Sequence, residues 1–309
     1  PTVIKLQMIV ADLLGKEDAL FVASGTMANQ VCLRTLTRHG DEIILEEDSH
    51  IFNYEVGSAS ALSGLQLYPI RGSRGVITAE QIKERIRPDD IHIPPTRVIV
   101  LENTHNRAGG TVFPLDEMKN IFSLASEFHI KMHLDGARLW NAVMATGTPL
   151  HTWAKPFDSV SVCLSKGLGA PIGSVIAGSG EFVRKARRVR KMYGGGMRQV
   201  GIIAAAGIYA IENNFNRLVE DHRNAQLLAE RLKDLEGLKI DLESVQTNIV
   251  VIDIAETKKS VEQFLKALKE KGILLVPFGK NRIRAVTHLD VKRDQILEAV
   301  EKFKEILQE

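Results

Sequence analysis

The sequence predicts an α/β protein with a large, doubly wound and mostly parallel sheet, followed by a small C-terminal α/β domain. Apolar runs of strand length alternate with helical stripes through most of the chain. Polar or glycine residues follow several of these runs directly, as at the ligand-binding edge of open α/β sheets. The length of 309 residues allows one large core and a smaller second one. We therefore divide the chain into residues 1–215 and 216–309.

Elements of the large domain follow from periodicity and from stop signals. An amphipathic helix over residues 1–14 ends at Gly15, and a short apolar run at 19–23 predicts the first strand. Glycine, asparagine and proline clusters separate the later elements. Further strands are predicted at 42–46, 66–70, 97–102, 131–135 and 159–166, and helices at 27–38, 78–86, 115–128, 139–145, 181–192, 197–213 and 217–235.

The C-terminal domain is predicted to repeat the alternation on a smaller scale. The last helix carries Ile296, Val300, Phe303 and Leu307 on one face, which is typical of core packing. Its predicted strands are 238–242, 248–254, 273–276 and 283–286, with a helix over 258–271.

Composition describes an ordinary globular protein, with 44% hydrophobic residues, 25% charged residues and a net charge of +2. Residues 184–191 form the one dense basic run, so nucleic acid is not an expected partner. No apolar run spans a bilayer and no signal peptide is visible, so we expect a cytoplasmic protein. Cys32 and Cys163 stand in apolar stretches, which favours buried free thiols. Because the chain begins at Pro1, an N-terminal piece can be missing.

One lysine stands out at the end of a predicted strand. Val160, Val162 and Leu164 alternate with small residues up to Lys166, and a glycine-rich bend follows. A desolvated lysine at this place can act as a nucleophile in Schiff-base chemistry. The alternative is an ordinary solvated lysine, which is the commoner case for a lysine taken alone.

Three further features stand at predicted strand ends. The turn Ser24, Gly25 and Thr26 joins a strand to a helix, where free N–H groups can bind a phosphate or Ser24 can simply cap the helix. Asp135 ends a strand, on the edge where ligands bind. His50 also follows a strand, although a lone histidine is more often structural.

Taken together, these features resemble the fold-type-I pyridoxal-phosphate enzymes, which have the architecture of aspartate aminotransferase. Longer strings are similar to the low-specificity L-threonine aldolases, within the β-eliminating lyases. These strings are residues 102–106 (ENTHN), 133–138 (HLDGAR), 163–169 (CLSKGLG), 194–199 (GGGMRQ) and 284–290 (RAVTHLD). The resemblance covers nearly the whole chain.

The resemblance implies pyridoxal 5'-phosphate as cofactor and no metal. Lys166 would hold the cofactor aldehyde as a Schiff base, and Asp135 would pair with the pyridine nitrogen. Ser24, Gly25 and Thr26 would hold the phosphate, and His50 would stack on the ring and can serve as a base.

The substrate and a second subunit account for the other implied residues. Arg138, which also lies beside the cofactor, and Arg284 would clamp the substrate carboxylate. His92 would lie near the substrate hydroxyl, with His105 as the weaker alternative. Lys191 and Arg198 are expected to reach the phosphate of a neighbouring subunit, which implies a homodimer with shared sites and a homotetramer.

The implied reaction is the retro-aldol cleavage of L-threonine, L-allo-threonine and other β-hydroxy-α-amino acids to glycine and an aldehyde. The base is left open between His50, His92, His105 and a water molecule. Another reaction of the same cofactor, β-elimination or transamination, is the alternative, and a non-catalytic phosphate-binding protein is the remote one. Family members carry an N-terminal arm with a substrate contact that this sequence does not include, so one carboxylate contact is unassigned.

Overall fold

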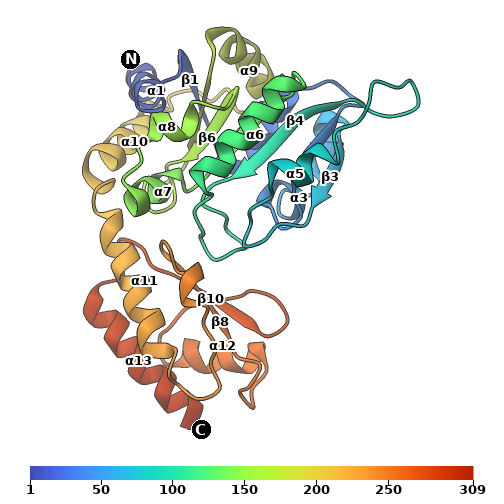
Figure 1. The fold of residues 1–309 in the computed structure, drawn as a ribbon. Helices are drawn as coiled ribbons and strands as arrows, with labels where there is room; N and C mark the ends of the chain where they lie inside the picture. Colours follow the sequence, from blue (N-terminus) through green and yellow to red (C-terminus); the bar gives the residue numbers. More distant parts are fainter. Residues whose placement is uncertain (309) are drawn as a thin grey trace.

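The computed structural model describes residues 1–308, which fold into a large lobe that contains the N-terminus and a small lobe that contains the C-terminus (Figure 1). Helix α11 (Leu218–Leu232) carries the chain from one lobe to the other. The strands of the large lobe are β1 (Asp18–Val22), β2 (Glu42–Glu46), β3 (Gln66–Ile70), β4 (Thr96–Glu102), β5 (Lys131–Gly136), β6 (Ser159–Cys163) and β7 (Ser174–Gly178). Its helices are α1 (Thr2–Leu14), α2 (Gly25–Leu36), α3 (His50–Asn53), α4 (Ser58–Ser63), α5 (Ala79–Lys83), α6 (Leu115–Glu127), α7 (Leu139–Thr146), α8 (Leu150–Ala154), α9 (Gly180–Met192) and α10 (Gly201–Asn214).

The seven strands form one sheet in the order β1-β7-β6-β5-β4-β2-β3. Pairings among β6, β5, β4, β2 and β3 are parallel, whereas β7 is antiparallel to both β1 and β6. The predicted α/β fold with a mostly parallel sheet is therefore confirmed. Strand β7 was not predicted, because the glycine-rich bend before it hides the start of the strand. That bend turns the chain back on itself, so that Cys163 pairs with Ser174.

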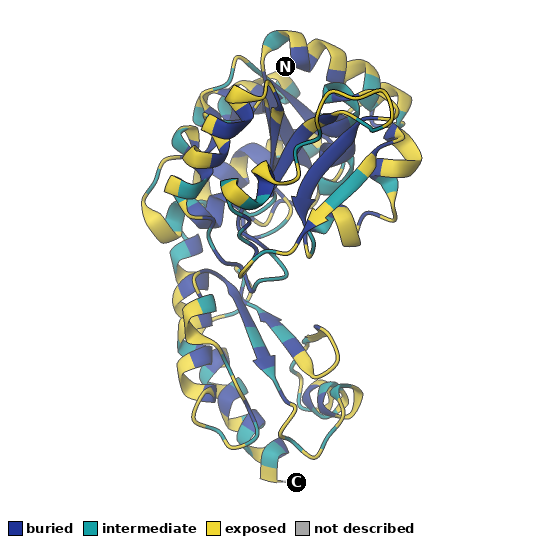
Figure 2. Ribbon diagram, turned by 45° about the vertical axis from the view of Figure 1, so that its right-hand side comes forward, coloured by how far each residue is buried: buried dark blue, intermediate teal, exposed yellow. Residues whose placement is uncertain are grey.

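Helices cover both faces of this sheet, and its strands are buried (Figure 2). Leu20, Val22 and Ile176 pack against α2 and α9, while the alternate residues Phe21 and Val175 belong to the core under α1 and α10. Successive residues of these strands thus point to opposite faces of the sheet and pack into two different cores. Among residues 1–308, none of the helices combines the length and the apolar character that a bilayer crossing requires.

Glycine at the end of α1 has the role that the sequence predicted. Gly15 has φ 62°, in the left-handed region, and its N–H bonds to the carbonyls of Ala11 and Asp12. The helix predicted over 197–213 starts later, at Gly201, because Gln199 has φ 50° and cannot belong to a right-handed helix.

A three-stranded antiparallel sheet, β8-β10-β9, forms the small lobe. Its elements are η1 (Leu242–Ser244), β8 (Ile249–Asp253), α12 (Val261–Glu270), β9 (Val276–Pro277), β10 (Arg282–Val286) and α13 (Arg293–Gln308). The strand predicted at 238–242 is wrong: Lys239 makes one isolated bridge to Asp253, and Asp241 then caps the 3-10 turn η1. Strand β9 overlaps the predicted strand 273–276 only at its end, because its pairing with β10 involves Val276 and Pro277 alone.

The two lobes meet through specific contacts. The hydroxyl of Thr247 donates to the carbonyl of Gly110 at 2.7 Å, and Arg74 pairs with Asp241 at 3.0 Å. Within α11, Leu218 belongs to the core of the large sheet, whereas the core of the small lobe starts at Ala225. The division of the chain at residues 215 and 216 stays a prediction.

Candidate active site

Several polar side chains meet where the parallel strands β4, β5 and β6 end. Glu102 at the end of β4 is in register with Asp135 on β5, and Asp135 with Ser161 on β6. Lys166 follows β6 by three residues, in the turn that leads back to β7. The carboxyl ends of parallel strands thus bring to one edge a set of groups that are far apart in the sequence.

Asp135 is buried and held from two sides. Its Oδ2 accepts from the Nδ2 of Asn29 at 2.9 Å, and its Oδ1 accepts from the backbone N–H of Ala137 at 3.1 Å. No lysine or arginine pairs with it among residues 1–308. A buried carboxylate fixed in this way is suited to a protonated ring nitrogen of a ligand.

Asn29 itself is fixed from behind by β5 and β6. Its Oδ1 accepts from the hydroxyl of Ser161 at 2.9 Å and lies 3.2 Å from Nε2 of His133. Burial lowers the pKa of His133 to about 4, so that this ring is neutral near pH 7 and donates to Asn29. His133 is therefore part of the support and not of the reacting surface.

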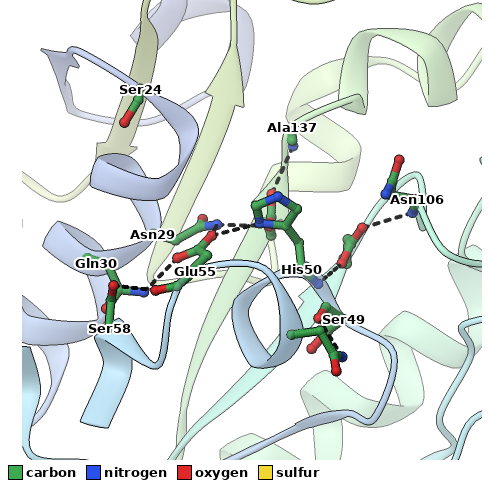
Figure 3. Close-up of polar contacts among 12 residues, drawn as sticks. Ser24, Asn29, Gln30, Ser49, His50, Glu55, Ser58, Asn106 and Ala137 are labelled. Atoms are coloured by element: carbon green, nitrogen blue, oxygen red, sulfur yellow. Dashed lines mark hydrogen bonds and ion pairs between the residues drawn. The ribbon is translucent and has the colours of Figure 1, made fainter. Parts of the chain in front are cut away.

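His50 lies at the start of α3 and is anchored at two points (Figure 3). Its backbone N–H donates to Oε2 of Glu102 at 2.8 Å, and its Nδ1 lies 3.0 Å from Oε1 of Glu55. The bond to Glu55 raises the pKa of His50, against the opposing effect of burial, and the charges of Asp135 and Glu102 add to it. One third of the side chain of His50 is exposed, so that a ligand can reach the ring.

Two arginines from different lobes converge on one amide. Arg138 and Arg284 each donate from Nη1 to Oδ1 of Asn106 at 3.0 Å, and Glu102 holds the backbone N–H of Asn106 at 2.8 Å. Neither arginine forms an ion pair with a carboxylate among residues 1–308, and Nε of Arg284 is buried without a partner. Burial lowers the pKa of both groups, and for Arg138 the charge of Arg284 adds to it. Two planar cations with an unmatched donor suit a ligand carboxylate.

The turn before α2 caps the helix, and it also leaves N–H groups that can bind a phosphate. Ser24 caps the helix, since its Oγ accepts from the N–H of Met27 at 3.1 Å. The N–H groups of Gly25 and Thr26 have no partner among the described residues, as expected for a helix start that can bind an anion. A Cβ on Gly25 would lie 3.0 Å from Sγ of Cys163, so the close approach to β6 favours glycine.

Lys166 is half-buried, and its amine has no hydrogen bond or ion pair in the part of the chain that the structure describes. The carbonyl of Lys166 accepts from the N–H of Gly169 at 2.8 Å, which closes the turn. A Cβ on Gly167 would lie 2.6 Å from Leu218, so α11 packs tightly beside the lysine. The amine is thus available at the edge that carries Asp135.

The structure does not bring His92 or His105 to this cluster. His92 is exposed and precedes β4, at the opposite edge of the sheet, so its place beside the substrate hydroxyl stays a prediction. His105 is buried and has both ring nitrogens engaged, Nε2 with Glu46 at 3.0 Å and Nδ1 with the N–H of Ala108 at 3.2 Å. It lines a separate cavity of about 500 Å³ between the lobes, away from the cluster around Asp135.

Comparisons with known proteins agree with this geometry. Residues 1–256 match the beta-eliminating lyase family. The low specificity L-threonine aldolase of Escherichia coli K12 is 40% identical over 96% of this chain and 87% of its own length. Low-specificity L-threonine aldolase 1 of Arabidopsis thaliana is 40% identical over 96% of this chain and 84% of its own length. The chain belongs to the beta-eliminating lyase family, among the low-specificity L-threonine aldolases.

Solved structures confirm the fold of this beta-eliminating lyase. Threonine aldolase of Leishmania major superposes with a TM-score of 0.83 at 20% identity and covers 99% of this chain and 89% of its own. An aspartate aminotransferase of Thermus thermophilus superposes with a TM-score of 0.74 at 17% identity, over 99% of this chain and 87% of its own. The predicted fold type I is thereby confirmed.

The residues of this beta-eliminating lyase fit the cofactor implied by its fold. A free helix start, a fixed buried carboxylate and an unpartnered amine lie on neighbouring elements, and Nε of Arg284 is unmatched among residues 1–308. Lys191 and Arg198 are exposed and stay predictions.

Four residues of the site have no role in the sequence analysis: Asn29, Glu55, Glu102 and Asn106. Glu102 and Asn106 stand in a string that carried the resemblance, so a signal existed for them. Asn29 and Glu55 had none.

Proposed function

We propose that the protein is a pyridoxal-phosphate-dependent aldolase that cleaves L-threonine and L-allo-threonine, and other β-hydroxy-α-amino acids, to glycine and an aldehyde. The observation that carries the proposal is the pair Arg138 and Arg284, converging without a carboxylate beside the edge that holds Asp135 and Lys166. An amino-acid substrate supplies the missing carboxylate. The names of the curated relatives support the choice of threonine.

Four groups of the chain would hold the cofactor. Lys166 would bind its aldehyde, Asp135 would face its pyridine nitrogen, and the start of α2 from Ser24 to Thr26 would bind its phosphate. His50 would lie against the ring. When bound, the cofactor supplies an electron sink that stabilises negative charge at the α-carbon of the substrate.

The chain itself orients the substrate and moves a proton. Arg138 and Arg284, one from each lobe, fix the substrate carboxylate and thereby the direction of the bond to be broken. The proton of the β-hydroxyl would pass to His50, to His92 or to a water molecule, since His105 has no free ring nitrogen. Because Nδ1 of His50 is engaged by Glu55, Nε2 is the atom that would accept it.

We further propose a homodimer with shared sites, assembled into a homotetramer, in which Lys191 and Arg198 serve the phosphate of the neighbouring subunit. Their exposure, and the absence of an anionic partner for either among residues 1–308, support this role. A cytoplasmic location in amino-acid metabolism is also proposed, and the two buried free thiols, Cys32 and Cys163, support it.

Product analysis tests the proposed reaction. The full-length protein is loaded with pyridoxal phosphate, and glycine and acetaldehyde are quantified from both threonine diastereomers. We expect equal amounts of the two products, and we expect Lys166→Ala to reduce them to background, because the variant lacks the amine that would bind the cofactor aldehyde. Release of ammonia with a keto acid would instead indicate β-elimination, and a keto acid without ammonia would indicate transamination. Full activity in Lys166→Ala would overturn the site.

A further inference from the structure

A second carboxylate, Glu55, is buried in the candidate site, and the proposed chemistry uses only its contact with Nδ1 of His50. It has no exposed surface and pairs with no lysine or arginine among residues 1–308. Its contacts are Nδ2 of Asn29 at 2.8 Å and Nδ1 of His50 at 3.0 Å, both on Oε1, and Nε2 of Gln30 at 2.6 Å on Oε2. Burying a carboxylate is costly unless hydrogen bonds compensate, and here His50 is the one titratable partner.

The surroundings of Glu55 fix the direction of its carboxylate. Asn29 and Gln30 are buried on α2, and the hydroxyl of Ser58 donates to the carbonyl of Glu55 through a short hydrogen bond. The chain turns directly after Glu55, where Val56 at φ 56° and Gly57 at φ 65° are both left-handed, and the carboxylate contacts the amides of α2. Figure 3 shows Glu55 between the amides of α2 and the imidazole.

One amide links this carboxylate to the other. Nδ2 of Asn29 donates one hydrogen to Glu55 and the other to Asp135, at 2.8 Å and 2.9 Å. His50, Glu55 and Asp135 offer ligand atoms within 4.8 Å of one another, as a metal site would. Since N–H donors already occupy Oε1 of Glu55 and Oδ2 of Asp135, the arrangement is a hydrogen-bond network and not a cation site.

We propose that Glu55 is a positioning residue: it keeps a proton on Nδ1 of His50, leaves Nε2 as the one free ring nitrogen toward the ligand, and ties this imidazole through Asn29 to Asp135. The inference deepens the proposed function and rests on it only for the identity of the ligand. It requires that a change of Glu55 alters the pKa of His50 even when no cofactor is bound. The groups that face His50 are Glu55, Asp135, Glu102 and the ring of Tyr54 at 5.8 Å.

Histidine NMR tests the proposal directly. Protein labelled with ¹⁵N-histidine is titrated without added cofactor, and the signals of His50 are assigned through His50→Asn. In the unaltered protein we expect the neutral ring to carry its proton on Nδ1. In Glu55→Gln the pKa of His50 should fall, because the charge that raises it is removed. An unaltered ring with a bare Nδ1, or a His50 that titrates alike in both proteins, would overturn the proposal.

Kinetics of the loaded enzyme give the second readout. We expect Glu55→Gln to lower kcat/KM about 10- to 100-fold, and the acid limb of its pH profile to move to lower pH with the pKa of His50. Gln30→Met is the matched control, because it removes a bond to the other oxygen of Glu55 and leaves Nδ1 of His50 engaged. In this control the acid limb should stay in place.

A double variant separates positioning from a merely structural effect. If Glu55 acts through His50, Glu55→Gln lowers kcat/KM far less in the His50→Asn background than in the parent. Equal losses in both backgrounds contradict the proposal. Should Glu55→Gln not fold, Glu55→Asp retracts the charge from Nδ1 by one methylene, and the NMR of the unaltered protein still decides. If the unaltered enzyme does not cleave threonine but Nδ1 of His50 carries the proton, the proposed reaction is refuted and the proposal for Glu55 stands.

Discussion

At the scale of residues, the candidate site consists of charges that the chain leaves unmatched. Arg138 and Arg284 share one amide oxygen, although each guanidinium can donate several hydrogen bonds. Arg284 also faces Arg107, whose guanidinium lies 3.9 Å from the centre of the Phe278 ring. These cations repel one another, and a ligand carboxylate would relieve that repulsion, so we expect the cluster to favour binding of the substrate carboxylate.

Replacing the planar guanidinium of Arg284 by the ammonium group of lysine tests whether Arg284 binds the substrate carboxylate. Arg284→Lys keeps the charge but cannot form two parallel hydrogen bonds, so we expect KM for threonine to rise about 10- to 100-fold. Arg282→Lys, two residues earlier on β10 and exposed, is the control and should leave KM within about twofold. Steady-state kinetics on both variants measure the difference. Equal effects would show that the strand, and not the carboxylate contact, was disturbed.

The sequence predicted the residues that we propose for the chemistry, but not the residues that support them. Lys166, Asp135 and Ser24 stand at strand ends, where position alone suggests a role. Glu55 and Asn29 meet His50 and Asp135 only after folding, and Asn29 lies 106 residues from Asp135. A buried polar residue carries no local pattern that distinguishes it from a surface one. The residues that support His50 and Asp135 could therefore not be predicted.

At the scale of elements, strand-to-helix turns build the site. The start of α2 leaves the N–H groups of Gly25 and Thr26 free next to β6, and the positive end of a 12-residue helix adds to them. The short strands β2 and β3 have the predicted bounds. Strand β7 and the 238–242 segment were mispredicted, because both depend on pairing with a strand distant in the sequence. Strand β7 pairs with β1, whereas the 238–242 segment makes only an isolated bridge to Asp253.

A comparison of two helix caps separates stability from phosphate binding. Ser24→Ala and Ser179→Ala each remove a hydroxyl that accepts from the N–H three residues on, at 3.1 Å in α2 and 3.2 Å in α9. Each should lower the free energy of unfolding by about 1 kcal/mol. Only Ser24→Ala should also weaken pyridoxal phosphate, because its hydroxyl lies at the proposed phosphate site. Urea unfolding and cofactor titration measure the two effects; equal affinity in both variants would remove Ser24 from the site.

At the scale of the whole molecule, the site depends on how the two lobes are arranged and, in the proposed dimer, on a second chain. Arg138 comes from the large lobe and Arg284 from the small lobe, and contacts such as Thr247 to Gly110 hold the lobes together. Lys191 and Arg198, by contrast, lie on the surface at the end of α9 and in the turn after it. Two cations without a partner in their own chain favour a role in another chain's site.

Mixing two inactive variants tests that arrangement. Suppose Lys166→Ala and Arg198→Ala are each nearly inactive. If Arg198 serves the neighbouring subunit, a mixed dimer has one site with both residues intact and one site with neither. Random exchange makes about half of the dimers mixed, so about a quarter of the parent's activity should return. Lys166→Ala mixed with Asp135→Ala is the control, because both residues belong to one chain's site and no mixed dimer is intact. Rescue absent from the first mixture, with mixed dimers demonstrated by affinity tags, would place Arg198 outside the shared site.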